Sequence, residues 1–306
     1  MKRFLLKVAV PSLLLIVAVV VIGEVLLRAF PHEMLYKSRW MDGHAEEVQV
    51  LVLGSSNTNR AIMPSELGLG KGFSCAGPSQ DLQNDSWILH RYVEQLDSLK
   101  YVIVDMNYLT PLLSIDYDDS YAALRKRYRI YWGNRDYAVR WWEWPEVSRF
   151  NWLAWYKDFV AEKDTIYADG FMSRPDETYN EDDWRYYAWM TAKDHTVIDD
   201  SNAARILEAN IDELRCMATT CRERGVKMVM VTCPVHEFFY EQLDQRQLEL
   251  MHSVADSLCA EYPNVYYMDF MTSPLFMAED MSNANHLNRR GALRFSQMVG
   301  DSIRRL

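Results

Sequence analysis

The feature that most constrains the fold of this chain is a short apolar run that stops abruptly at a glycine and two serines. Residues 48–53 are apolar except for Gln49, and Gly54, Ser55 and Ser56 follow at once. A run of this kind is typical of a buried parallel strand. In open α/β sheets, ligands bind in the crevice beyond the carboxyl ends of such strands. Ser56 is therefore placed like a nucleophile, although most Gly-Ser-Ser triplets are ordinary turns.

Apolar runs and segments of helical periodicity alternate along most of the remaining chain. We expect five strands, at residues 48–53, 73–76, 101–104, 226–232 and 265–270. We expect helices over residues 78–98, from the capping residues 199–201 to Gly225, and over 242–261 and 291–304. This alternation predicts a three-layer α/β/α sandwich with a mostly parallel five-stranded sheet.

Composition limits the class of partner. The chain has 306 residues, of which 49% are hydrophobic and 25% charged, and this suits one large domain with a sizeable insertion. A net charge of −10 argues against a nucleic-acid partner, because that function needs a broad basic face. No cysteine pair has the C-x-x-C spacing of a metal or redox site. We expect no metal and no cofactor.

The five cysteines are an odd number for an exported chain, so at least one should be free or pair between chains. They are Cys75, Cys216, Cys221, Cys233 and Cys259. We interpret them as small, buried apolar side chains.

The N-terminal segment 5–30 has the composition of a membrane span. Only Lys7, Glu24 and Arg28 interrupt it, and its centre, residues 8–23, carries no charge. About twenty such residues cross a bilayer. The alternative is a cleaved signal peptide, but the segment offers no good small-x-small cleavage site, which favours an uncleaved anchor.

Basic residues precede this segment, which predicts that the N-terminus is cytoplasmic and the bulk of the chain extracytoplasmic, on the periplasmic side of the cytoplasmic membrane. We therefore divide the chain into a single-pass signal anchor, residues 1–30, and a domain over residues 31–306. An insertion of about 110–200 interrupts that domain.

The insertion is rich in aromatic residues. Eight of the ten tryptophans fall in it: Trp132, Trp141, Trp142, Trp144, Trp152, Trp155, Trp184 and Trp189. We interpret it as a lid or wall over the crevice. Aromatic faces stack on sugar rings, so one hypothesis is a glycan-binding surface. The others are a compact aromatic core, or contact with lipid headgroups or a membrane partner.

A histidine near the C-terminus supplies the second part of a candidate site. His286 lies between the last predicted strand and the last predicted helix, at the same sheet edge as Ser56. A serine hydrolase needs a base within reach of its hydroxyl and a third group that orients the ring. The alternative is a surface-loop histidine near a helix start.

Four ordered sequence blocks resemble the SGNH/GDSL hydrolase superfamily. The branch is the membrane-anchored bacterial one, similar to proteins of alginate O-acetylation and teichoic acid D-alanylation. The blocks are residues 54–56, 73–80, 225–234 and 286–292. The resemblance implies a flavodoxin-like sandwich and spans nearly all of the predicted ectodomain except the aromatic insertion.

The resemblance also implies a mechanism and partners. Ser56 would attack an ester carbonyl, and His286 would take its proton. The oxyanion would be held by the Ser56 N–H, an N–H near Gly77 to Ser79, and Asn107. The acyl group, implied to be acetyl, would pass to water or to a hydroxyl of a cell-envelope polysaccharide. A membrane-bound O-acyltransferase is the implied protein partner.

The chain departs from the superfamily pattern at the orienting acid. An Asp usually lies three residues before the histidine, where this chain has Asn283; Asp280 is the nearest alternative acid. Gly77 and Ser79 both compete for the second oxyanion position, and Asn107 could instead be a strand-end cap. The competing hypothesis for the whole protein is an anchored, non-catalytic module that binds glycan or a membrane partner on a decayed hydrolase scaffold.

Overall fold

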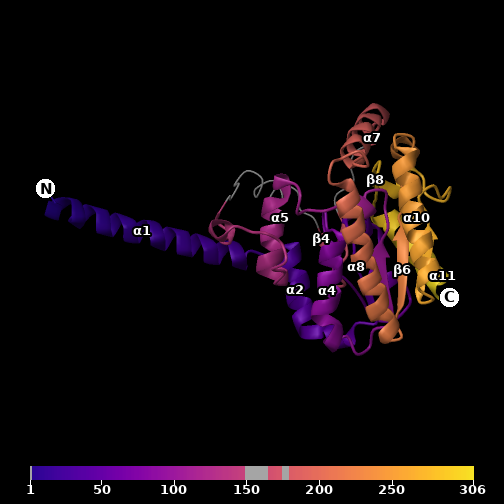
Figure 1. The fold of residues 1–306 in the computed structure, drawn as a ribbon, viewed down its shortest axis with the longest axis horizontal. Helices are drawn as coiled ribbons and strands as arrows, with labels where there is room; N and C mark the ends of the chain where they lie inside the picture. Colours follow the sequence, from indigo (N-terminus) through magenta and orange to yellow (C-terminus); the bar gives the residue numbers. More distant parts are fainter. Residues whose placement is uncertain (1, 149–164, 174–178) are drawn as a thin grey trace.

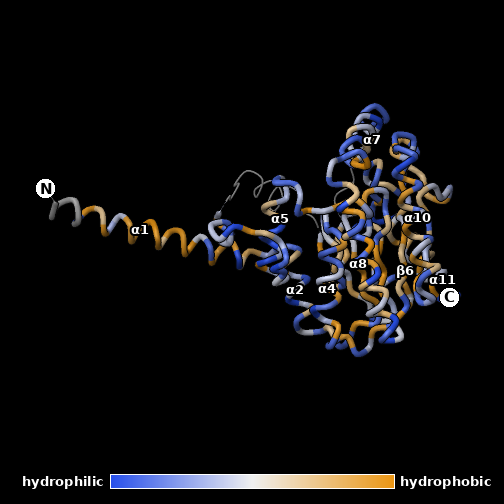
Figure 2. Tube along the Cα trace, in the orientation of Figure 1, coloured by the Kyte–Doolittle hydropathy of each residue, from blue (hydrophilic) through white to orange (hydrophobic). Residues whose placement is uncertain are grey.

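The computed structural model describes residues 2–148, 165–173 and 179–306. A long N-terminal helix, α1 (Lys2–Ala29), projects from an α/β body that contains the C-terminus (Figure 1). It runs unbroken through Pro11, and its orange colour in Figure 2 marks its apolar character. Within the described ranges, α1 is the one helix long and apolar enough to cross a membrane.

The body is built on a five-stranded, all-parallel sheet of order β2-β1-β3-β6-β7, as the alternation of strands and helices predicts. Its strands are β1 (Val50–Val52), β2 (Gly72–Ser74), β3 (Tyr101–Asp105), β6 (Lys227–Thr232) and β7 (Val265–Asp269). In register, Leu51 of β1 lies between Phe73 of β2 and Val102 of β3. The inner strands are buried because helices cover both faces of the sheet.

Two groups of helices make the outer layers. One group contains α4 (Leu82–Tyr92), α8 (Ala203–Glu223) and α10 (Gln245–Glu261), in which α8 contacts both neighbours. In the other, α11 (Arg289–Ile303) packs on α3 (Ser56–Ala61). The protein is therefore a three-layer α/β/α sandwich.

Several predicted helix starts move by a few residues. The helix expected from residue 78 begins at Leu82, since Asp81 caps it by accepting from the N–H of Asn84. The helix expected after residues 199–201 has Asn202 as its N-cap, and Asp199 pairs with Arg246.

The predicted end of α8 holds, whereas the start of α10 moves by three residues. Gly225, with φ +68°, follows the end of α8, as expected of a helix-ending glycine. The helix expected from residue 242 begins at Gln245, where Asp244 is the cap.

The chain between β3 and α8 mixes short helices with one long one. Its described elements are η4 (Thr110–Leu112), η5 (Asp119–Tyr121), α5 (Ala122–Arg127), η6 (Tyr128–Trp132), η7 (Trp141–Glu143), β4 (Thr165–Ile166), β5 (Met172–Ser173) and α7 (Glu181–His195). The tryptophans divide between two environments. Trp132 and Trp184 are buried, whereas Trp141, Trp142, Trp144 and Trp189 are exposed. Trp152 and Trp155 lie outside the described residues.

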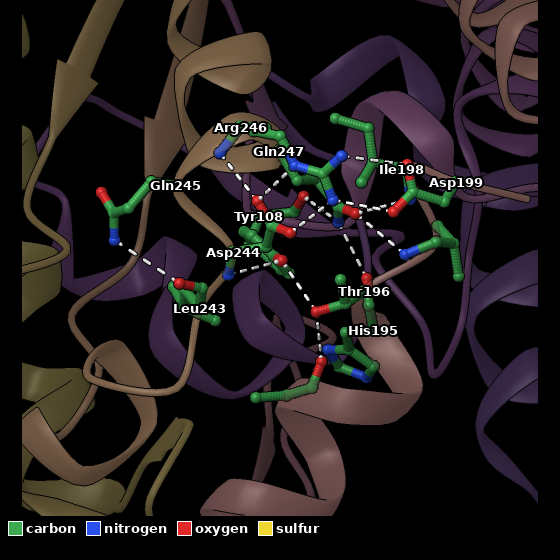
Figure 3. A network of polar contacts seen from close by, with 12 residues as sticks. Tyr108, His195, Thr196, Ile198, Asp199, Leu243, Asp244, Gln245, Arg246 and Gln247 are labelled. Atoms are coloured by element: carbon green, nitrogen blue, oxygen red, sulfur yellow. Dashed lines mark hydrogen bonds and ion pairs between the residues drawn. The ribbon is translucent and has the colours of Figure 1, made fainter.

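A buried glutamine ties the end of α7 to the sandwich (Figure 3). The Gln247 side chain donates to the carbonyls of Tyr108 (3.0 Å) and His195 (2.8 Å). Its oxygen accepts from the N–H groups of Val197 (2.9 Å) and Ile198 (3.1 Å). One side chain thus joins the exit of β3, the end of α7 and the start of α10. It fixes α7 beside the carboxyl edge of the sheet.

All five cysteines lie in the described residues, and none forms a disulfide within the chain. Cys75, Cys221 and Cys233 are buried, as expected, whereas Cys216 is exposed and Cys259 is partly buried.

Candidate active site

Ser56 and His286, 230 residues apart, meet at the carboxyl edge of the sheet. The Oγ of Ser56 lies 2.9 Å from Nε2 of His286. On the other side of the ring, Nδ1 lies 3.1 Å from the side-chain oxygen of Asn283. Serine, histidine and asparagine therefore form a continuous hydrogen-bonded row.

A small hairpin, and not the expected loop, carries the histidine. Strand β8 (Met281–Asn283) pairs antiparallel with β9 (His286–Leu287), and Asn283 lies opposite His286 in register. The N–H of His236, in the loop after β6, donates to the carbonyl of Ala284 at 2.9 Å. The hairpin is thus fastened to the sheet edge where Ser56 emerges.

Gly54 allows the chain to turn sharply between β1 and Ser56. Its φ is +126°, a conformation that L side chains rarely adopt. A Cβ at this position would lie 2.2 Å from the Cβ of Asp105, so glycine is also required for space. Its N–H donates to Oδ1 of Asp85 at 2.9 Å. Only glycine can deliver Ser56 to the start of α3 in this way.

Ser55 fixes the same turn to Asp105 at the end of β3. Its Oγ donates to the buried carboxylate of Asp105 at 2.5 Å, and its N–H donates there at 3.2 Å. The Asn107 amide donates to Oγ of Ser55 (3.0 Å) and to Asp105 (2.8 Å). The Asn107 oxygen accepts from the N–H groups of Leu109 and Thr110. The structure thus gives Asn107 the contacts of a strand-end cap, in place of the expected approach to Ser56.

The second block forms a tight turn in which the two candidate oxyanion donors, Gly77 and Ser79, have different environments. The Gly77 N–H donates to the carbonyl of Gly54 at 2.9 Å, so it is engaged by the backbone. The turn closes where the Gln80 N–H donates to the Gly77 carbonyl at 3.2 Å. Ser79, in the turn, has φ +51° and is the one described non-glycine residue with a positive φ. Such strain, of order 1–3 kcal/mol, clusters at functional sites.

Buried carboxylates bind both the turn at Gly54 to Ser56 and the turn at Gly77 to Gln80. The sequence reasoning missed this role. Gln80 donates to Asp85 at 2.5 Å and accepts from the Tyr128 hydroxyl at 2.8 Å. Burial raises the pKa of Asp85 well above its usual value, and the charges of Asp105 and Asp81 raise it further. Burial likewise raises the pKa of Asp105 and of Asp81. The available signal was an Asp at helical spacing from Leu82 and Leu89, on the apolar face of α4.

Lys37, on the helix that follows α1, also reaches the site and was missed. Helix α2 (Glu33–His44) carries it, and its side chain is almost fully buried. The ammonium donates to the side chain of Asn59 on α3 at 2.8 Å and to the Ala76 carbonyl at 2.5 Å. It also pairs with Glu33 at 2.6 Å. The segment beside the proposed anchor therefore supports both loops of the site.

Asp280 does not orient the histidine. Its buried carboxylate lies 2.6 Å from Arg294 and 3.1 Å from Arg290, both on α11. It is the last residue of η9 (Ala278–Asp280) and ties that turn to the last helix. These arginine contacts on Asp280, and the contact of Asn283 with Nδ1 of His286, favour Asn283 as the residue that orients the ring.

The row of Ser56, His286 and Asn283 is suited to moving a proton from a hydroxyl to an imidazole. Within residues 2–148, 165–173 and 179–306, no group of three or more His, Cys, Asp or Glu side chains could hold a metal ion.

Comparison with known proteins finds distant structural likenesses and no match in sequence. No family model matches the chain, and no curated protein matches it in sequence. A structure provisionally described as a platelet activating factor from Streptococcus pneumonia aligns with TM-score 0.42 and 11% identity, covering 94% of this chain and 98% of that one. A provisionally described acylhydrolase from Bacteroides fragilis aligns at 0.41 and 9%, covering 87% and 95%. A GDSL-like lipase from Bacteroides thetaiotaomicron aligns at 0.41 and 9%, covering 90% and 100%. Likenesses of this size do not establish a family.

Proposed function

We propose that this protein is a membrane-anchored serine esterase or O-acyltransferase of the SGNH type. The observation that carries the proposal is the 2.9 Å contact between Oγ of Ser56 and Nε2 of His286, with Asn283 on the far side of the ring. A nucleophile, a base and an orienting group in a row are the minimum that acyl transfer by serine requires.

The reaction proceeds in two halves. Nε2 of His286 accepts the Ser56 proton while Oγ bonds to the ester carbonyl carbon, and the carbonyl oxygen becomes an oxyanion. The intermediate collapses when the carbon–oxygen bond to the alcohol breaks and His286 returns the proton to that oxygen. Water, or a glycan hydroxyl, then attacks the acyl-serine by the same route in reverse.

Two backbone N–H groups are proposed to hold the oxyanion. The Ser56 N–H lies in the first turn of α3, where N–H groups have no acceptor within the helix. Ser79 supplies the second, since the Gly77 N–H already donates to Gly54. Removing one such donor from an enzyme costs about a hundredfold to a thousandfold in turnover. Asn107 does not contact the oxyanion in this proposal. It supports the site by hydrogen-bonding Ser55 and Asp105.

A neutral orienting group makes the proposed enzyme slow. The Asn283 oxygen can hold the tautomer with a proton on Nδ1, but it adds no negative charge to stabilise the imidazolium. In chymotrypsin-type triads, replacing the orienting Asp by Asn lowers turnover about ten-thousandfold. We therefore expect slow turnover, whether the acceptor is water or a glycan hydroxyl.

The proposed substrate is an acetylated cell-envelope polysaccharide. A group of exposed aromatic side chains on α7, Tyr186, Tyr187 and Trp189, supports this, because aromatic rings stack on sugars. Trp184 of the same helix packs edge-on against His236, at 5.4 Å between ring centroids, and His236 holds the β8–β9 hairpin. In Figure 1, α7 projects at the same end of the sheet as β8.

The remaining partner and location assignments rest on the sequence. An acetyl group and a membrane-bound O-acyltransferase partner follow from the resemblance. Anchoring through α1 with an extracytoplasmic body follows from its length, its apolar composition and the basic residues at its N-terminal end.

Labelling with a fluorophosphonate probe tests the catalytic proposal. The full chain in detergent should be labelled, Ser56→Ala should not, and the exposed-site control Ser65→Ala should label like the wild type. Failure of both the wild type and Ser56→Ala to label would favour the alternative function, a binding module for glycan or for a membrane partner. The neutral Asn283, at the position of the orienting acid, is the observation that supports this alternative function.

A further inference from the structure

Three exposed tryptophans lie together on the insertion, beside the end of α1. Trp141 and Trp142 belong to η7, and Trp144 follows it. Their exposed fractions are 71%, 53% and 45%. Large aromatic side chains in such a group ordinarily mark a surface that contacts a partner or a membrane.

A hydrogen bond ties this segment to α1. The N–H of Val147 donates to Oε2 of Glu24 at 2.9 Å. Glu24 follows the uncharged centre of α1, residues 8–23, which at 1.5 Å per residue spans most of the hydrocarbon core. In Figure 1 the magenta chain that leads into the first grey trace passes beside the body end of α1. The tryptophans are thus held near the depth at which α1 would leave the hydrocarbon.

Arginines accompany the tryptophans. The Arg129 guanidinium lies 4.6 Å from the ring centre of Trp144, and that of Arg140 lies 5.6 Å from the ring centre of Trp142. Arg28, on α1, is exposed. Tryptophan is enriched at the headgroup level of membranes, and arginine is attracted by anionic lipids. Apolar rings with cations above them match the chemistry of that layer.

We propose that residues 141–144 form a second membrane contact, in which Trp141, Trp142 and Trp144 insert into the headgroup layer of the bilayer that α1 crosses. The inference rests on the proposed anchoring by α1 and is independent of the catalytic proposal. A single helix leaves a domain free to swing at its joint, whereas two contacts fix its tilt. The contact therefore sets the orientation of the sandwich relative to the membrane surface.

Quenching by brominated lipids tests the contact directly, because α1 contains no tryptophan. The full chain is reconstituted into vesicles of phosphatidylcholine and phosphatidylglycerol, with or without bromine on the acyl chains near the headgroups. We expect quenching of the wild type, and loss of more than half of the quenched fraction when Trp141, Trp142 and Trp144 all become Ser. The control Trp189→Ser, at a position on α7 exposed to 48%, should keep it. If the triple variant fails to fold, the single variant Trp141→Ser, at the most exposed position, replaces it. This variant should also lower quenching.

The outcomes separate the two proposals. If the chain does not float with the vesicles, the anchor fails and this contact fails with it. If the chain floats but is not quenched, or if the triple variant is quenched like the wild type, the anchor stands and the second contact is overturned.

Discussion

The ammonium of Lys37 donates a 2.8 Å hydrogen bond to the side-chain oxygen of Asn59, and so joins the helix after α1 to the helix that begins with Ser56. The same ammonium donates to the Ala76 carbonyl and pairs with Glu33. The amide of Asn59 donates back to Glu33 at 2.7 Å. A buried cation with three partners thus joins α2 to the two turns of the candidate site.

Replacing Lys37 by Met should destabilise the protein. The change leaves Glu33 and the Ala76 carbonyl without their cation, and breaking a buried pair costs about 3–5 kcal/mol. Denaturant unfolding in detergent measures this difference. The control Lys71→Met removes an exposed pair with Glu47 and should cost less than about 1 kcal/mol. Equal losses in the two variants would contradict the role of Lys37.

Replacing Asn283 by Asp should raise hydrolysis of a small aryl acetate. A carboxylate at this position would stabilise the imidazolium that forms on His286, and the gain can reach about ten-thousandfold. Initial rates measure it. Asp280→Ala should lower stability with little effect on turnover of the folded fraction, because its carboxylate faces Arg290 and Arg294. Abolished turnover in Asp280→Ala, together with an unchanged rate in Asn283→Asp, would reverse this assignment.

Stability should fall as the pH rises above the ordinary carboxyl range. Burial raises the pKa of Asp85 and of Asp105 in the folded state, so the folded state binds more protons than the unfolded state. The free energy of unfolding then decreases with pH, from the unfolded pKa of about 3.9 up to the raised folded pKa. Unfolding at a series of pH values measures the slope. Asp85→Asn should flatten it, whereas the exposed-site control Asp97→Asn should leave it unchanged. An Asp85→Asn slope as steep as that of the wild type would refute this origin.

Replacing Gln247 by Leu should loosen α7 from the sandwich. Four hydrogen bonds disappear, and two backbone N–H groups lose their acceptor (Figure 3). A buried group left unsatisfied costs about 1–3 kcal/mol, and because Val197 and Ile198 are only partly buried, the expected total loss is about 1–3 kcal/mol. Thermal unfolding measures it, and proteolysis near residues 195–198 should increase. The neighbour Gln245, which is exposed and makes one 3.4 Å bond, is the matched control. A Gln245→Leu loss as large as that of Gln247→Leu would contradict the role of the network.

Local sequence patterns determined the sandwich. Apolar runs of strand length, glycines that stop them and helical periodicity between them act over a few residues, so the order of elements is readable from the chain. The same patterns place the ends of the strands before Ser56 and His286 at one sheet edge. They also identify α1, because length and apolarity are properties of one continuous segment.

Tertiary structure decided which neighbours each polar side chain meets. Gly77 and Ser79 are equivalent candidates in sequence, and only the bond from Gly77 to Gly54 distinguishes them. Asp280 is drawn to α11 by arginines that follow it in the chain, so the orienting position falls to Asn283. A lysine such as Lys37 is ordinarily exposed, and here it is buried because Asn59 and Ala76, from distant segments, contact its ammonium. These outcomes depend on contacts between distant segments, whose free energies no local pattern encodes.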